Sequence, residues 1–190
     1  MSAEQLTLFA GTQAVATGDH GDMAAAIKDL QARGDTRPLL VFDDVSGEQV
    51  DIDLRAAGVL VPAIKEAPER KGPGRPRLGV VSREVTLLPR HWEWLNAQPS
   101  GASATLRKLV DQARRDNATG DSARRSQEAA CRFMTALAGN EVGFEEACRS
   151  LFAGDRQGFM ARVAQWPEDV AAFATKLASD AFGADDDDLT

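Results

Sequence analysis

The sequence predicts an α+β protein: a small N-terminal ββαββ unit, a basic linker, a short strand-helix-helix segment and a C-terminal four-helix bundle. Short apolar runs, some of them alternating with polar residues, dominate the first 60 residues and are typical of strands. Apolar residues spaced three and four apart dominate from residue 121 onward and are typical of amphipathic helices. The stretch between them is rich in Pro, Gly, Lys and Arg, a composition that predicts a linker.

Four strands and one helix are expected in the N-terminal unit. Gly11 separates the first two strands, which we expect to form a hairpin. Asp22 is expected to cap the helix, whose apolar positions recur at helical spacing, and Gly34 is expected to end it. The third strand is a continuous apolar run, and the fourth alternates between apolar and charged residues. The strands are expected at residues 6–9, 13–16, 39–42 and 50–54.

Changes in composition set the expected boundaries. The linker has few large apolar side chains, so it cannot bury enough surface to pack. The next segment is expected to form a strand that stops before Pro89, a short helix, and a second helix capped by Ser103. The expected parts are the ββαββ unit 1–60, the linker 61–80, the strand-helix-helix segment 81–120, the helical bundle 121–183 and an acidic tail 184–190.

Basic residues are concentrated in one part of an acidic chain. The whole sequence has a formal net charge of −7. Residues 70–125 contain twelve Lys or Arg and five Asp or Glu, which gives this stretch a net charge of about +7. A local excess of positive charge in an acidic protein favours a polyanion as partner, and a solvated Arg-rich helix surface is the alternative explanation.

Local motifs for catalysis, metal binding and membrane insertion are absent from the sequence. The two cysteines, Cys131 and Cys148, lie in helical patterns without a Cys-x-x-Cys spacing, and only two histidines are present, so we expect no metal and no cofactor. No phosphate-binding glycine loop or nucleophile elbow occurs, so an enzyme is not expected. No apolar run reaches the roughly 20 residues of a membrane span, and the N-terminus lacks a charged-then-apolar signal, which favours the cytoplasm without membrane contact.

The linker contains a short motif with a chemistry of its own. Gly74-Arg75-Pro76, flanked by Lys71 and Arg77, resembles the core of an AT-hook, an arm that lies in the minor groove of A/T-rich DNA. Proline favours an extended backbone, glycine allows close approach to the groove floor, and arginines suit the strongly negative potential of a narrow groove. A plain solvated linker is the alternative.

The strand-helix-helix segment resembles a ribbon-helix-helix subunit. The resemblance rests on Pro89-x-x-Trp92-x-x-Leu95 and Ser103-x-x-Leu106-Arg107. In that family, two chains pair their strands into a ribbon that enters the major groove of DNA, and the second helix holds a phosphate on its first backbone amides. The resemblance therefore implies a homodimer with Ser103 at the DNA backbone.

The expected strand departs from the ribbon-helix-helix pattern. Polar residues two and four positions before the proline read bases in that family, but Leu87 and Val85 occupy these positions here. The polar residues Glu84 and Thr86 have the opposite phase and would face the other way. Base-specific reading by this strand is therefore doubtful, and an ordinary small domain or dimer interface is the alternative. Three arginines remain candidates for sequence-independent contacts with phosphates: Arg83, Arg90 and Arg107.

Nearly the full length of the sequence resembles an uncharacterised bacterial family, domain-of-unknown-function family 2239. The motifs that carry this resemblance are residues 74–92, 101–103, 143–147 and 151–155. The resemblance implies no established activity, so the functional hypothesis depends on the residues themselves.

The sequence as a whole favours a cytoplasmic DNA-binding protein that forms a homodimer, with a regulatory role as one form of that function. It would use the linker and the strand-helix-helix segment mainly for contacts with the phosphate backbone of DNA. The candidate DNA-binding residues are Lys71, Arg75, Arg77, Arg83, Arg90, Ser103 and Arg107. One alternative is a protein-interaction adaptor that binds no nucleic acid. The other is an enzyme with a site between the N-terminal unit and the bundle.

Overall fold

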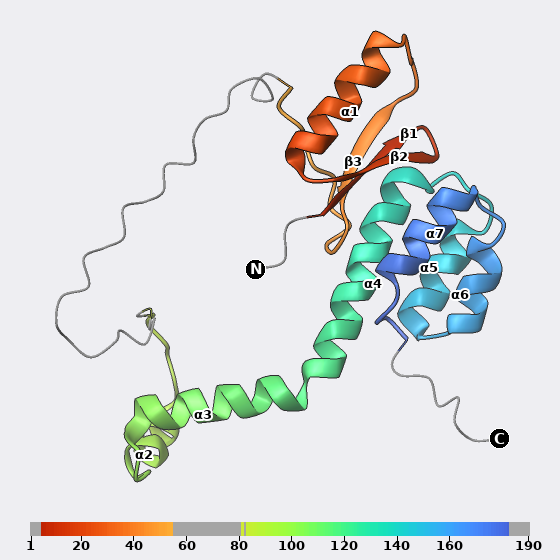
Figure 1. The fold of residues 1–190 in the computed structure, drawn as a ribbon. Helices are drawn as coiled ribbons and strands as arrows, with labels where there is room; N and C mark the ends of the chain where they lie inside the picture. Colours follow the sequence, from red (N-terminus) through yellow and green to blue (C-terminus); the bar gives the residue numbers. More distant parts are fainter. Residues whose placement is uncertain (1–4, 55–80, 82, 183–190) are drawn as a thin grey trace, which may run out of the picture. The chain divides into compact units, whose positions relative to one another are not determined.

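The computed structural model describes residues 5–54, 81 and 83–182. Within these residues the chain forms three strands and seven helices (Figure 1), which confirms the α+β class. The chain divides into two compact units. We call residues 1–59 and 118–190 the main unit and residues 60–117 the hairpin unit, and we describe each by itself. The expected linker 61–80 and acidic tail 184–190 lie outside the described residues.

The sheet of the main unit is antiparallel, with strand order β2-β1-β3. All five residues of the central strand β1 are buried, because both faces of the sheet are covered. Leu6 and Leu8 contact an apolar cluster that includes residues of helix α1, whereas Phe9 belongs to the larger core. The strands are β1 (Leu6–Ala10), β2 (Gln13–Gly18) and β3 (Leu39–Asp43).

The fourth strand expected at residues 50–54 is wrong. Gln49 forms an isolated bridge with Phe42, and the amide of Val50 donates to the carbonyl of Val41 at 2.8 Å. Beyond this point the described residues of the segment form no strand. The alternating pattern arises because Val50, Ile52 and Leu54 pack against the cluster beside α1, and such packing does not require a ladder of backbone hydrogen bonds.

Helix α1 (His20–Ala32) begins with a capping box. The carboxylate of Asp19 accepts hydrogen bonds from the amides of Gly21 and Asp22, and the Asp22 carboxylate accepts one from the amide of Asp19. Asp19 is therefore the N-cap, and the expected cap Asp22 is instead the reciprocal third residue of the box. Gly34 adopts φ +77° just after the helix, which confirms the predicted end.

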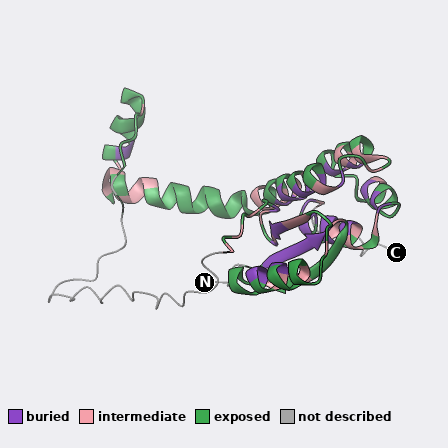
Figure 2. Cartoon of the chain, turned by 90° about the horizontal axis from the view of Figure 1, so that it is seen from above, coloured by how far each residue is buried: buried purple, intermediate pink, exposed green. Residues whose placement is uncertain are grey.

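The four helices expected in the C-terminal part are confirmed, with ends shifted by a few residues. Figure 1 shows them gathered beside the sheet, and Figure 2 shows that the main unit's buried residues lie on its strands and on one side of its helices. Gly143 and Gly154, both with left-handed backbone conformations, flank the second of these helices. The helices are α4 (Ala118–Leu137), α5 (Phe144–Ala153), α6 (Arg156–Val163) and α7 (Glu168–Leu177).

A cluster of four phenylalanine rings joins the sheet to the helices. Phe133 of α4 lies 4.7 Å from Phe173 of α7 and 5.0 Å from Phe42 of β3, measured between ring centroids. Phe9 of β1 lies 5.4 Å from Phe173. The sequence left open whether the N-terminal unit packs on the rest of the chain, and this cluster shows that it shares one core with α4 and α7.

Buried polar contacts link the same elements. The carboxylate of Asp44 accepts a hydrogen bond from the Thr7 hydroxyl and another from the Lys176 ammonium, each at 2.7 Å. The Asp44 side chain is only 4% exposed, so its charge is compensated mainly by these two partners. Arg132 of α4 also donates to the carbonyl of Ser46, at 2.9 Å from Nη2.

Replacing Lys176 tests this link. Lys176→Met is expected to lower the free energy of unfolding by about 1–3 kcal/mol, because it leaves the Asp44 carboxylate buried without a counter-charge. Urea unfolding measures the loss. Lys28→Met, at an exposed position of α1, removes the same charge and is expected to change stability by less than about 0.5 kcal/mol. Equal losses in the two variants would show that the pair with Asp44 contributes nothing specific.

Candidate nucleic-acid interface

The described part of the hairpin unit contains helix α2 (Pro89–Asn96) and helix α3 (Gly101–Asp116), which pack against each other. Pro89 occupies the first turn of α2, where the missing amide costs no helical hydrogen bond. Gly101 adopts φ +71° at the turn between the helices, a conformation that favours glycine. Among the described residues of this unit, only Leu95 is buried, with 3% of its surface exposed.

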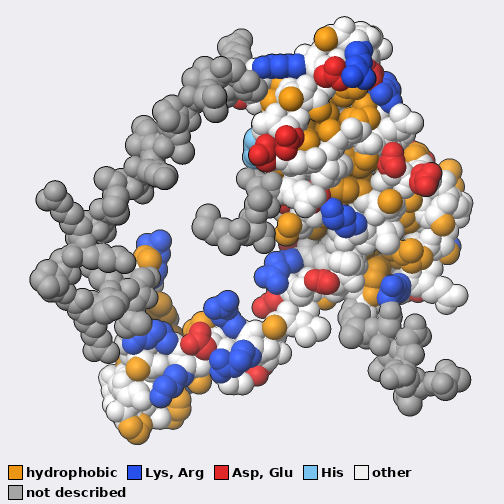
Figure 3. All heavy atoms as spheres, viewed as in Figure 1, with side chains coloured by type: hydrophobic (Ala, Val, Ile, Leu, Met, Phe, Trp, Pro, Cys, Tyr) orange, Lys and Arg blue, Asp and Glu red, His pale blue; other side chains and the backbone are white. Residues whose placement is uncertain are grey.

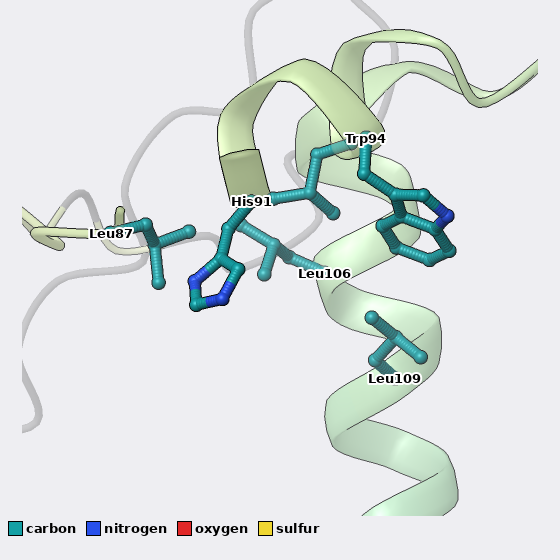
Figure 4. Close-up of a pocket in the computed structure, with 6 residues that line it drawn as sticks. Leu87, His91, Trp94, Leu106 and Leu109 are labelled. Atoms are coloured by element: carbon teal, nitrogen blue, oxygen red, sulfur yellow. The ribbon is translucent and has the colours of Figure 1, made fainter. Parts of the chain in front are cut away.

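A groove of about 270 Å³ lies between the two helices. Figure 4 shows side chains from α2, α3 and the segment before α2 arranged around it. Its lining is hydrocarbon and indole with a single imidazole, so it has no pair of groups suited to acid-base or nucleophilic catalysis. The residues that line it are Leu87, His91, Trp94, Leu95, Leu106 and Leu109.

The strand expected from Arg83 to Leu88 is wrong, because the described chain has no regular secondary structure there. A strand needs a neighbour for its backbone groups, and no described segment pairs with this one. Val85 is 54% exposed, whereas Leu87 is partly buried and lines the groove. The apolar residues of this segment therefore do not form a core within the described hairpin.

Four basic side chains lie on the exposed side of α3. Helical spacing places Arg107 and Arg114 two turns apart on one side of the helix, with Lys108 and Arg115 next to them. The apolar residues Leu106, Leu109 and Ala113 lie on the other side of α3, and Val110 lies at the border, next to Arg107 and Arg114. Figure 3 shows Lys and Arg side chains along this helix.

No carboxylate of the described residues lies within ion-pair distance of these four basic groups. Lys108 donates to the hydroxyl of Ser100 at 3.2 Å, and Arg115 donates to the side-chain oxygen of Gln112 at 2.8 Å. Both acceptors are neutral. Helical spacing places Asp111 among these four residues, where it lowers the positive charge without forming an ion pair. A net positive charge remains, which makes this side of the helix suitable for an anionic partner.

The structure describes four of the seven candidate residues, and all four are exposed: Arg83, Arg90, Ser103 and Arg107. The prediction that Ser103 caps α3 is wrong, because the helix begins earlier, with Ser100 at the N-cap position. The Ser100 side chain forms no capping hydrogen bond. Ser103 lies instead within the first helical turn. The other three candidates, Lys71, Arg75 and Arg77, lie outside the described residues. Sequence reasoning did not single out Arg114 or Arg115, although the seven-residue spacing from Arg107 and Lys108 was a usable signal.

The described part of the main unit contains no metal-binding cluster and no membrane-spanning helix. Among the described residues, no group of three metal-ligating side chains comes together, and each helix is too short or too polar to cross a bilayer. Cys131 and Cys148 are free and partly buried. Burial raises the pKa of the Cys148 thiol to about 11, and the neighbouring Cys131 adds to this effect. A thiol with such a pKa is a weak nucleophile at neutral pH.

Fold and site together define an α+β protein in which a basic helical hairpin accompanies a sheet-and-helix core. Residues 5–178 match the family model DUF2239, described as "Uncharacterized protein conserved in bacteria", and the chain belongs to this family. The comparison with curated proteins and the comparison with solved structures gave no match. The family resemblance is thus confirmed, whereas the resemblances to a ribbon-helix-helix subunit and an AT-hook remain predictions.

Proposed function

We propose that this protein binds DNA, mainly through the phosphate backbone, with the basic side of α3. The observation that carries the proposal is the row of four basic side chains without a carboxylate partner among the described residues. The protein as a whole has a formal charge of −7 and would repel a polyanion. Attraction must therefore come from a local surface, and α3 provides one.

The spacing of these side chains suits a row of phosphates. Arg107 and Arg114 are separated by about 10 Å along the helix axis, a length over which one DNA strand presents about three phosphates. Arginine forms two parallel hydrogen bonds with a phosphate, and Lys108 and Arg115 add positive charge beside them. Such contacts position a protein on DNA but carry no sequence information.

Other candidate residues extend this surface in the proposal. The first turn of α3, which contains Ser103, has backbone amides suited to a phosphate, and Arg83 and Arg90 add charge near α2. The linker residues Lys71, Arg75 and Arg77 would supply any contact with the minor groove, in the manner of an AT-hook. Binding to the phosphate backbone of DNA does not require strand pairing of the ribbon-helix-helix type.

Fluorescence anisotropy with A/T-rich and G/C-rich duplexes at two salt concentrations tests the proposal. Arg107→Gln with Arg114→Gln is expected to weaken binding at least about tenfold at low salt and to reduce the slope of log K against log salt by about 2, because two phosphate contacts are lost. Lys28→Gln with Arg149→Gln changes the net charge equally at exposed positions of the main unit and should leave the slope unchanged.

The absence of binding at low salt would refute DNA binding altogether. Similar losses in both double variants would show that net charge, rather than α3, governs association. A preference of the wild-type protein for A/T-rich DNA would indicate a groove contact by the linker, because the contacts proposed for α3 are independent of sequence.

The second candidate function is a protein-interaction adaptor. The apolar groove of the hairpin and the exposed Trp94 favour it, because aromatic side chains are enriched at protein interfaces. Purification of the protein from its bacterial host would test it: a bound foreign protein without any nucleic-acid absorbance would favour the adaptor over DNA binding.

A further inference from the structure

The described hairpin buries too little apolar surface to be stable by itself. Thirty-six residues are described in this unit, and Leu95 is the one buried side chain among them. Burial of a leucine contributes about 1.5–3 kcal/mol, whereas ordering the backbone costs roughly 1–2 kcal/mol for every residue. Units of this size usually need a disulfide, a metal or another chain. Another surface must therefore cover the hairpin.

The exposed apolar side chains show where that surface would lie. Trp94 and Leu109 line the groove yet are 52% and 48% exposed, and Val110 beside Leu109 is 55% exposed. We call the groove together with Leu88, Trp92 and Val110 the hairpin apolar surface. It contains no acidic or basic residue except His91, so its partner needs no complementary charge.

We infer that the hairpin apolar surface binds the same surface of a second copy of this chain. In a two-fold symmetric interface, both copies use the same patch. A protruding side chain of one copy must therefore meet a recess in the same patch of the other copy. The hairpin offers both a recess, the groove, and an exposed apolar side chain outside the groove lining, Val110 on α3.

The available area is sufficient for a dimer. With about 150 Å² per aliphatic residue and about 250 Å² per tryptophan, the exposed parts of five side chains amount to roughly 450 Å² for each copy. Two copies would bury about 900 Å² from these side chains alone, and the polar rim brings the total above the roughly 1,000 Å² expected of a specific interface. The five are Leu88, Trp92, Trp94, Leu109 and Val110.

Charge also favours a second copy. Lys108 and Arg115 lie away from the apolar side of α3, and Arg107 and Arg114 border it beside Val110, so self-association leaves the basic side chains at or outside the rim of the interface. A partner that is required for folding must be present wherever the chain is synthesised, and a second copy meets this condition. If the proposed DNA binding holds, the dimer presents two basic helices to one duplex, which raises avidity; the dimer itself does not depend on DNA.

Sedimentation equilibrium of the full chain between about 1 and 100 µM tests the inference. The wild-type protein is expected to have twice the monomer mass of 20.4 kDa. Leu109→Glu is expected to raise the dimer dissociation constant at least about 100-fold, because each interface would bury two carboxylates and no basic residue lies three or four positions from residue 109. Gln112→Glu introduces the same charge on the polar side of α3 and should leave the dimer intact.

Tryptophan fluorescence provides a second measurement that needs no variant. Dilution through the dissociation constant is expected to increase acrylamide quenching of Trp92 and Trp94, while Trp166, which is 5% exposed in the main unit, stays protected. Any of three results would overturn the inference: a wild-type monomer at 100 µM, equal dissociation in both variants, or a foreign protein bound in place of the second copy. A dimer that binds no DNA would refute only the proposed function, and a monomer that binds DNA would refute only the dimer.

Discussion

Phe133→Ala is expected to lower the free energy of unfolding of the main unit by about 3–5 kcal/mol. Phe133 is fully buried, and its ring lies 5.5, 5.0 and 4.7 Å from the rings of Phe9, Phe42 and Phe173, measured between centroids. The substitution removes a large apolar side chain and leaves a cavity where the sheet meets α4 and α7. Urea unfolding followed by circular dichroism measures the loss.

Phe152→Ala is the matched control, because this phenylalanine is 53% exposed on α5. Its cost should be below about 1 kcal/mol, since little apolar surface is removed from the core. The strands and the helices of the main unit should also unfold in one transition in the wild-type protein, because they share the aromatic cluster. A variant Phe133→Ala as stable as Phe152→Ala would contradict the shared core.

Gly47→Ala is expected to destabilise the main unit by about 2–5 kcal/mol, for two additive reasons. Gly47 adopts φ +65°, a conformation that strains any residue with a Cβ. In addition, a Cβ at this position would overlap with the carbonyl oxygen of Ala129 and lie 2.9 Å from its carbonyl carbon. Backbone of α4 cannot yield as a flexible side chain does, so the turn would have to move away from the helix.

Gly34→Ala separates the two contributions. Gly34 also has a positive φ, +77°, but a Cβ there would meet no atom within 4 Å. Its substitution should therefore cost only the backbone strain, about 1 kcal/mol. Thermal or urea unfolding of both variants gives the comparison, and equal losses would show that the close approach to α4 is unimportant.

The turn that holds Gly47 is itself well ordered by hydrogen bonds. The Asp43 carboxylate accepts from the amides of Ser46 and Val45 at 2.6 and 3.1 Å. Although partial burial opposes this effect, these bonds hold the pKa of Asp43 below its ordinary value. Arg132 donates to the Ser46 carbonyl, so a side chain of α4 also holds the residue that precedes Gly47.

The candidate site was only partly predictable. Local composition was sufficient to locate the basic segment and to select Arg107, because clustered charge is visible in the sequence itself. It was not sufficient to show that α3 has no carboxylate partners among the described residues, since Asp111 and Asp116 lie on the same helix. That outcome depends on how the side chains are arranged in space.

The sequence by itself determined the α+β class and the helices, because apolar periodicity, glycine and proline act within a few residues of the chain. Only the tertiary structure decided which surfaces meet. It joined Phe9 and Phe42 to the core of α4 and α7, and it left two expected strands without regular pairing. The physical reason is that a pattern identifies which face of an element is apolar, whereas the partner that covers this face, or pairs with its backbone, lies far away along the chain.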